Sequence, residues 1–138
     1  MIFVDTNVIS ETMRIQPSPA VMSWLAAHDE LLAVSTVTIA EIAFGIEKIR
    51  PDERSERLAA GLNDWRQRFA DRIFPLTDQA ALLYGELMGV TYRSGVGVSV
   101  PDGMIAAIVK ANRGQLATRN TKDFEPLNLD LINPWDKQ

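Results

Sequence analysis

The sequence predicts an α/β fold with three layers, α/β/α, in which a central, mostly parallel β-sheet is covered by helices on both faces. Two observations lead to this prediction. Short apolar runs typical of buried strands alternate with longer amphipathic segments typical of helices, the pattern of parallel sheets with crossover helices. The length of 138 residues suits one hydrophobic core, so we expect a single domain over residues 1–138.

The first half of the chain predicts two strands, each followed by helical segments. The opening "MIFVD" is a short apolar run that ends at the polar, helix-starting pair Thr6-Asn7. "SPAVMSWLAAH" is predicted to be helical, with Pro19 near its start, and "LLAVS" to be the second strand. Two amphipathic helices are predicted over 36–50 and 51–69; the second has apolar residues on one face at Leu58, Leu62, Trp65 and Phe69.

The second half continues the alternation. "RIFPL" predicts a short strand, and a longer amphipathic helix is predicted from Asp78 to about Arg93. After the loop "SGVGVSV", the segment "PDGMIAAIVKANRG" predicts a helix, with proline near its first turn and Gly114 just past its end. "QLATRN" is the next predicted strand, and "LDLINPW" contains a short final strand.

Composition excludes several kinds of chemistry. The chain has no cysteine, which excludes disulfides and thiolate metal sites. Its single histidine, His28, excludes a histidine acid–base pair and a histidine-rich zinc site. The net charge of -4 differs from the broad basic surface of a duplex-binding protein. No leader-like or membrane-length apolar segment is present, so we expect a cytoplasmic protein that does not bind membranes.

Four acids follow strands or begin the helices after them. Asp5 ends the first strand, Glu41 lies one turn into the helix after the second, Asp102 lies in the first turn of a helix, and Asp123 follows the strand "QLAT". In a parallel sheet these positions share one edge, where ligands of such folds bind. Each acid also has a structural explanation, because all four lie where helix caps and turns use carboxylates.

Clustered carboxylates point to a hard divalent cation. Acids packed together repel one another, and at least one pKa rises unless a cation is present. Mg²⁺ prefers oxygen ligands, commonly one or two carboxylates with several waters, and Mn²⁺ suits the same donors. Such a site can activate water and neutralise the charge on a phosphodiester. The residues alone therefore indicate metal-dependent phosphoryl chemistry.

Four segments resemble, in order and spacing, the motifs of the PIN-domain nucleases, especially the VapC-type and FitB-type toxins. They are "FVDTNVISE", "STVTIAEIAFGIEKI", "VPDGMIAAIVKA" and "LATRNTKDF". On that resemblance, Asp5, Glu41 and Asp102 match the three most constant acids of the family. The fourth family position falls at Asn120 or Asp123, and we favour Asp123, with Asn120 as a neutral neighbour. Thr6, Asn7 and Thr118 match polar residues that support the acids.

The resemblance implies a PIN-like fold and an endoribonuclease that uses Mg²⁺ or Mn²⁺ on single-stranded or structured RNA. It also implies a homodimer and a cognate antitoxin that blocks the site and binds operator DNA. We expect part of the apolar stripe of the helices around Ile46 and residues 58–69 to receive an antitoxin segment. The basic residues that are candidates for RNA-backbone contacts are Arg14, Lys48, Arg93, Arg119 and Lys122.

Other functions of acid-bearing α/β proteins were considered. A phosphoacceptor receiver domain needs a phosphorylatable Asp on a central strand and a later Lys, an arrangement that is not clear here. A haloacid-type phosphatase needs a second acid where this chain has Asn7. A non-catalytic PIN-like adaptor that keeps the acids and a receiver-type domain are the alternatives, and metal-dependent RNA cleavage separates a nuclease from both.

Overall fold

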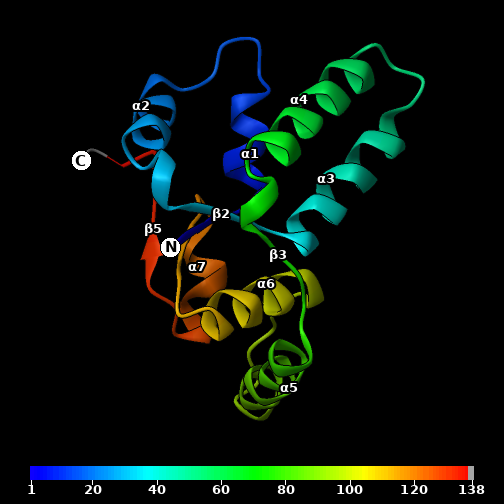
Figure 1. The fold of residues 1–138 in the computed structure, drawn as a ribbon. Helices are drawn as coiled ribbons and strands as arrows, with labels where there is room; N and C mark the ends of the chain where they lie inside the picture. Colours follow the sequence, from blue (N-terminus) through cyan, green and yellow to red (C-terminus); the bar gives the residue numbers. More distant parts are fainter. Residues whose placement is uncertain (137–138) are drawn as a thin grey trace.

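The computed structural model describes residues 1–136, which form five strands, seven α-helices and three short 3-10 helices (Figure 1). The strands are β1 (Ile2–Val4), β2 (Leu32–Ser35), β3 (Ile73–Phe74), β4 (Gln115–Ala117) and β5 (Leu131–Ile132). The α-helices are α1 (Thr6–Thr12), α2 (Pro19–Ala27), α3 (Thr36–Ile49), α4 (Arg54–Arg68), α5 (Asp78–Arg93), α6 (Val100–Ala111) and α7 (Thr121–Phe124). The 3-10 helices are η1 (Asp29–Leu31), η2 (Ala70–Arg72) and η3 (Glu125–Leu127).

The strands form one sheet in the order β3-β2-β1-β4-β5, and every neighbouring pair is parallel. β1 is therefore central, with Phe3 beside Ala33 of β2 on one side and beside Leu116 of β4 on the other. Parallel strands need crossover connections, and the helices between consecutive strands supply them. The predicted α/β fold with a parallel central sheet is confirmed.

Alternating side chains of the strands enter two separate cores. Ile2 and Val4 of β1 join a core formed with α1, α2, α3 and α4, whereas Phe3 points into a second core formed with α5, α6 and α7. All three side chains are at most 3% exposed. This is the period-2 pattern of a strand buried on both faces, and it gives the predicted three layers.

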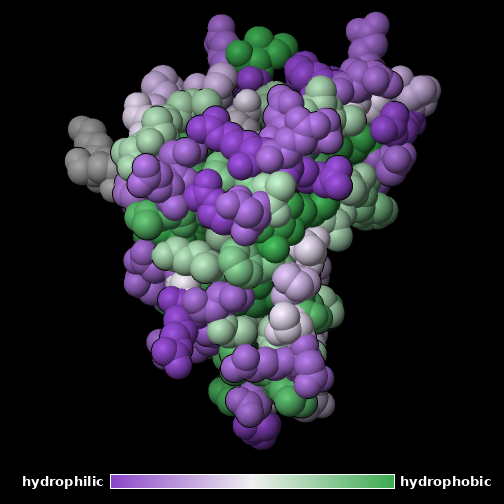
Figure 2. All heavy atoms as spheres, in the orientation of Figure 1, coloured by the Kyte–Doolittle hydropathy of each residue, from purple (hydrophilic) through white to green (hydrophobic). Residues whose placement is uncertain are grey.

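Figure 1 shows the layers as two groups of helices on either side of the sheet. α1 to α4 lie on one side, with α3 and α4 as an antiparallel hairpin, and α6 and α7 lie on the other with α5 outermost. The tapered end that contains α5 carries apolar as well as polar surface (Figure 2). Leu82 and Val90 of α5 are exposed apolar residues. Among the described residues, no helix combines the length and the hydropathy needed to cross a membrane.

Close approach of α5 and α6 depends on Gly103, which is buried in the first turns of α6. A Cβ atom at this position would lie 2.5 Å from the sulfur of Met88 and 2.9 Å from the Tyr84 ring, closer than van der Waals contact allows. Any side chain here must displace the side chain of Met88 or Tyr84. The neighbouring residue is Asp102, so this contact also fixes where that carboxyl lies.

Several predicted boundaries were too wide. β3 covers only Ile73–Phe74 of the predicted 72–76, and β4 ends at Ala117 rather than continuing to residue 120. The sequence pattern predicts no helix between the last two strands, whereas the structure has α7 and η3 there. α7 is a single turn of four residues, too short to show helical periodicity.

Candidate active site

Asp5 is the most buried of the four predicted acids. It follows β1, is 5% exposed and is the N-cap of α1. Its carboxylate accepts hydrogen bonds from the Thr6 backbone N–H and from the Thr118 hydroxyl, both at 2.8 Å. Burial raises the pKa of Asp5 to about 6; these two hydrogen bonds oppose the rise, and the nearby charges of Asp102 and Glu41 add to it.

Glu41 approaches Asp5 from α3. Its carboxylate accepts a 2.9 Å hydrogen bond from the hydroxyl of Thr6, the first residue of α1. The helix-capping explanation offered for the four acids is wrong for Glu41. The N-cap of α3 is Ser35, whose hydroxyl accepts from the Thr38 N–H at 3.0 Å. Glu41 is thus joined to another element of the site rather than to its own helix terminus.

Asp102 reaches the same edge from the first turn of α6. Ser99 is the N-cap, and its hydroxyl accepts from the Asp102 N–H at 3.3 Å. Burial raises the pKa of Asp102; a hydrogen bond from Ser99 lowers it, and the charges of Glu41 and Asp123 raise it further. The capping explanation therefore holds for Asp102, and the same residue also faces two other acids.

Asp123 lies in α7 with an exposed side chain, close enough to Asp102 for its charge to raise that pKa. Asn120, the other candidate for the fourth position, is the N-cap residue of α7 and makes no side-chain capping bond. Its backbone N–H donates to the Thr118 hydroxyl at 3.1 Å. The four predicted acids thus lie along the C-terminal edge of the sheet, near enough for their charges to raise the pKa values of Asp5 and Asp102.

The polar residues predicted to support the acids form one network around Thr118, which is fully buried. The Thr118 hydroxyl donates to Asp5 and accepts from the Asn7 side-chain amide at 3.3 Å. The carbonyl oxygen of the Asn7 side chain accepts from the Arg119 N–H at 3.2 Å. Asn7 therefore ties the start of α1 to the end of β4, and Thr118 orients the carboxylate between them.

This donor set fits a divalent cation held partly by water. Among residues 1–136, no three acidic or histidine side chains are grouped closely enough to hold a metal ion by themselves. Mg²⁺ commonly takes only one or two carboxylates and keeps several waters. Burial is the main cause of the raised pKa values of Asp5 and Asp102, and the charges of the neighbouring acids add to it; a bound cation would offset both effects.

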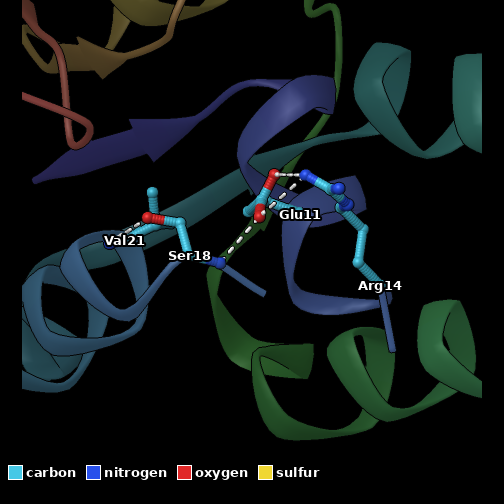
Figure 3. Close-up of polar contacts among 4 residues, drawn as sticks. All are labelled: Glu11, Arg14, Ser18 and Val21. Carbon is cyan, nitrogen blue, oxygen red and sulfur yellow. Dashed lines mark hydrogen bonds and ion pairs between the residues drawn. The ribbon is translucent and has the colours of Figure 1, made fainter. Parts of the chain in front are cut away.

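The opposite end of α1 is fixed by Glu11, a residue that sequence reasoning did not single out (Figure 3). Its carboxylate is 5% exposed and accepts a 2.7 Å hydrogen bond from the Ser18 N–H and a 3.3 Å one from Arg14. Ser18 in turn is the N-cap of α2, bonded to the Val21 N–H. The sequence gives one indication of this role. Glu11 follows the apolar residue Val8 by three positions, which places both on the same face of a helix.

The five basic candidates for RNA contacts are spread unevenly around this edge. Arg14 lies beyond the C-terminal end of α1 and pairs with Glu11 at 3.3 Å, so its position does not suit a contact at the acids. Arg119 and Lys122 are exposed near Asn120 and Asp123, and Arg119 lies 5.0 Å from the Trp135 ring centroid. Lys48 is exposed on α3, two turns beyond Glu41, and Arg93 ends α5.

The chain matches a known family and known proteins over nearly its whole length. The sequence pattern of the PIN domain matches residues 2–127. The chain is 38% identical to the plasmid stability protein StbB of Pseudomonas syringae pv. tomato, over 99% of both chains. It is 37% identical to the VapC ribonuclease Y4jK of Sinorhizobium fredii, again over 99% of both.

The toxin FitB of Neisseria gonorrhoeae is 33% identical over 98% of this chain and 99% of its own. The crystal structure of FitAcB from that organism superimposes with a TM-score of 0.88 and 33% identity, covering 98% of this chain and 99% of that one. The structure of FitAB bound to an IR36 DNA fragment gives a TM-score of 0.89 at 31% identity, covering 100% and 98%. Matched in sequence and fold over nearly its whole length, the chain belongs to the PIN-domain family, in the group of the VapC and FitB proteins.

Proposed function

We propose that this chain is a metal-dependent endoribonuclease and the toxin of a type II toxin–antitoxin module. The observation that carries the proposal is the convergence of Asp5, Glu41, Asp102 and Asp123 on one edge of the sheet, where the charges of their carboxylates act on one another. The names of the relatives support it, since one is a VapC ribonuclease and another is the toxin FitB.

In this proposal one or two of the four carboxylates bind Mg²⁺ or Mn²⁺ directly, and the others, Asp123 among them, act through water bound to the ion. The bound cation supplies an activated water and neutralises charge on the phosphodiester. Thr118 and the Thr6 N–H keep the Asp5 carboxylate in one orientation, and the Thr6 hydroxyl does the same for Glu41. Their role is to fix the acids before substrate arrives, which lowers the reorganisation needed during reaction.

The decisive test is cleavage of cellular RNA. Brief expression followed by sequencing of RNA 5′ ends should reveal new cuts and arrested growth, both absent for Asp5→Asn and Asp102→Asn. Purified variants with unchanged circular dichroism should fail to cut RNA with Mg²⁺ or Mn²⁺. A wild-type protein that binds RNA without cutting it under any of these conditions would favour the non-catalytic adaptor. We also propose that the protein acts in the cytoplasm, where its RNA substrate is found.

We further propose an antitoxin partner that occupies the groove between α2 and α4. This groove encloses about 260 Å³ and is lined by apolar side chains that include Met22, Leu25, Trp65 and Phe69. Of the apolar stripe expected to receive the antitoxin, Ile46, Leu62 and Phe69 are largely buried within the chain, and Trp65 is the member that is partly exposed in this groove. The structure of FitAB bound to DNA supports a partner of this kind, which would also bind operator DNA.

The homodimer implied by the family is part of the same proposal. Leu82 and Val90 on α5 are 70% and 52% exposed, and apolar surface of this kind suits a contact with a second copy. Sedimentation of the free protein at several concentrations tests it. A monomer at all concentrations up to about 100 µM would remove the dimer from the proposal, since specific dimers are commonly stable at micromolar concentration.

A further inference from the structure

An exposed aromatic side chain lies one turn from the acids, on the same helix as Glu41. Phe44 is 66% exposed, whereas the apolar residues Ile42 and Ile46 of the same helix are buried. Residues three apart on a helix lie about 5–6 Å apart at their Cβ atoms, so Phe44 stands next to Glu41. Leaving such a ring in water is unfavourable, and nothing in the packing of α3 requires it.

A basic side chain accompanies the ring. The Lys48 ammonium lies 5.3 Å from the centroid of the Phe44 ring, at the separation of a cation–π contact. Among residues 1–136 no carboxylate forms an ion pair with Lys48. Glu41, Phe44 and Lys48 therefore form one stripe along α3, from acid to ring to cation, about 10 Å long.

On the side of Phe44 toward the acids, the surface of α3 carries only small side chains. A Cβ atom added at Gly45 would meet nothing within 4 Å, and Ala40 and Ala43 are exposed. On the other side, the exposed Glu47 is paired with Arg50. A single large apolar side chain among small ones offers too little area for a protein partner, whose interfaces need about 800 Å² per side. A flat ligand of the size of one nucleobase matches it, because bases stack on exposed aromatic rings without regard to sequence.

We propose that Phe44 and Lys48 form a subsite for the single-stranded RNA, in which one base stacks on the Phe44 ring and Lys48 contacts a neighbouring phosphate. The inference rests on the proposed function, since it takes the strand that enters the acidic edge as the ligand. Phe44 and Lys48 are positioning residues: they hold the strand beside the carboxylates and take no part in bond breaking. Stacking would favour an unpaired base, so the subsite also selects against duplex.

The test measures binding separately from cleavage. The probe is a fluorescein-labelled single-stranded 2′-O-methyl oligoribonucleotide of mixed sequence, whose Kd is measured by anisotropy in Mg²⁺. Phe44→Ala should weaken binding about 5- to 150-fold, the range for losing one base stack, whereas Phe44→Trp should stay close to wild type. Lys48→Gln should weaken binding and lower its salt dependence, and Lys48→Arg should restore both.

Matched controls lie at the other end of the sheet. Leu31 in η1 is 50% exposed, and Lys110 lies in the last turn of α6, so Leu31→Ala and Lys110→Gln should bind as wild type. Probes with one abasic nucleotide at successive positions supply a second readout. One abasic position should weaken wild-type binding but leave the Kd of Phe44→Ala unchanged, because the stacking partner is already gone.

The outcomes separate the two proposals. A wild-type protein that binds the probe, with the predicted losses, yet cuts no natural RNA would overturn the nuclease and keep the subsite. Normal cleavage together with an unchanged Kd for Phe44→Ala, or no binding of the probe by the wild type, would overturn the subsite alone. A Phe44→Ala protein that changes from dimer to monomer in sedimentation, and binds normally per chain, would assign the ring to a contact between copies and overturn the subsite as well.

Discussion

At the end of β1, the buried Asp5 carboxyl has its pKa raised from 3.8 to about 6, chiefly by burial. The folded protein therefore holds this proton at pH values where the unfolded chain has lost it. Below about pH 4, protonated Asp5 contributes about 3 kcal/mol to the free energy of unfolding. This contribution is lost as the pH rises toward 6. Asp5→Asn removes that loss, so in EDTA the variant should be more stable than wild type at pH 8 but not at pH 4.

Urea unfolding of both proteins at pH 4 to 8 in EDTA measures this difference. The comparison isolates Asp5 because every other titrating group is common to the two proteins. Added Mg²⁺ should reduce the difference between the two free energies of unfolding at pH 8, because it stabilises wild type more than the variant. Ligands that bind only the folded state raise its stability. If the two free energies of unfolding differ by the same amount at pH 4 and pH 8, Asp5 has an ordinary pKa.

The fourth acid can be identified by comparing two neighbouring residues. Asp123→Asn should reduce cleavage at subsaturating Mn²⁺ more than Asn120→Ala does, because a carboxylate offsets the cation's charge and an amide does not. Initial rates over a Mn²⁺ series give the apparent metal affinity of each variant. If Asn120→Ala is the more impaired of the two, the fourth position belongs to Asn120.

At the scale of the element, α1 links the site to the rest of the fold through both of its ends. Thr6 and Asn7 bind the acids and β4 at one end, and Glu11 holds the Ser18 N–H at the other. Glu11→Ala leaves that N–H without its acceptor and should lower the free energy of unfolding by about 2–3 kcal/mol. Glu11→Gln keeps an acceptor and should cost about half as much.

Arg14→Ala is the matched control. The Arg14 side chain is 65% exposed, and exposed ion pairs contribute about 1 kcal/mol or less. Thermal or urea unfolding of the three variants should therefore rank Glu11→Ala as least stable and Arg14→Ala as nearly wild type. Equal losses for Glu11→Ala and Arg14→Ala would mean that the ion pair, and not the bond to Ser18, fixes the end of α1.

The elements that the sequence predicted well are those that have a periodic pattern or fixed positions in a parallel sheet. Asp5, Glu41 and Asp102 were expected to converge because the C-terminal ends of parallel strands share an edge, and the structure brings them together. α7 has too few residues for a pattern. The bond from Thr6 to Glu41 joins residues 35 apart in the chain, and no local rule distinguishes it from a helix cap.

For the whole molecule, the distribution of charge predicts how the antitoxin binds. The groove between α2 and α4 is mostly apolar, with Asp29, Asp64 and Arg68 also lining it, while the acids at the sheet edge attract basic side chains. Apolar burial should therefore set the dissociation rate, and charge the association rate. Stopped-flow measurements with the antitoxin should show association slowed about tenfold or more between 50 and 500 mM salt, with dissociation nearly constant. Rates indifferent to salt, with RNA cleavage intact in the complex, would contradict this form of inhibition.

The contact of Gly103 with α5 has a consequence for genetic screens. Colonies that survive induction of the toxin would carry substitutions at Asp102 and at Gly103 alike, and the two would look the same on a plate. Asp102→Asn removes a charge and leaves the shape of α6 intact, whereas any side chain at Gly103 must displace Met88 or Tyr84. A survivor map alone would therefore place Gly103 among the catalytic residues. Growth at lowered temperature would separate the classes, because a packing defect is partly relieved there and a missing carboxylate is not.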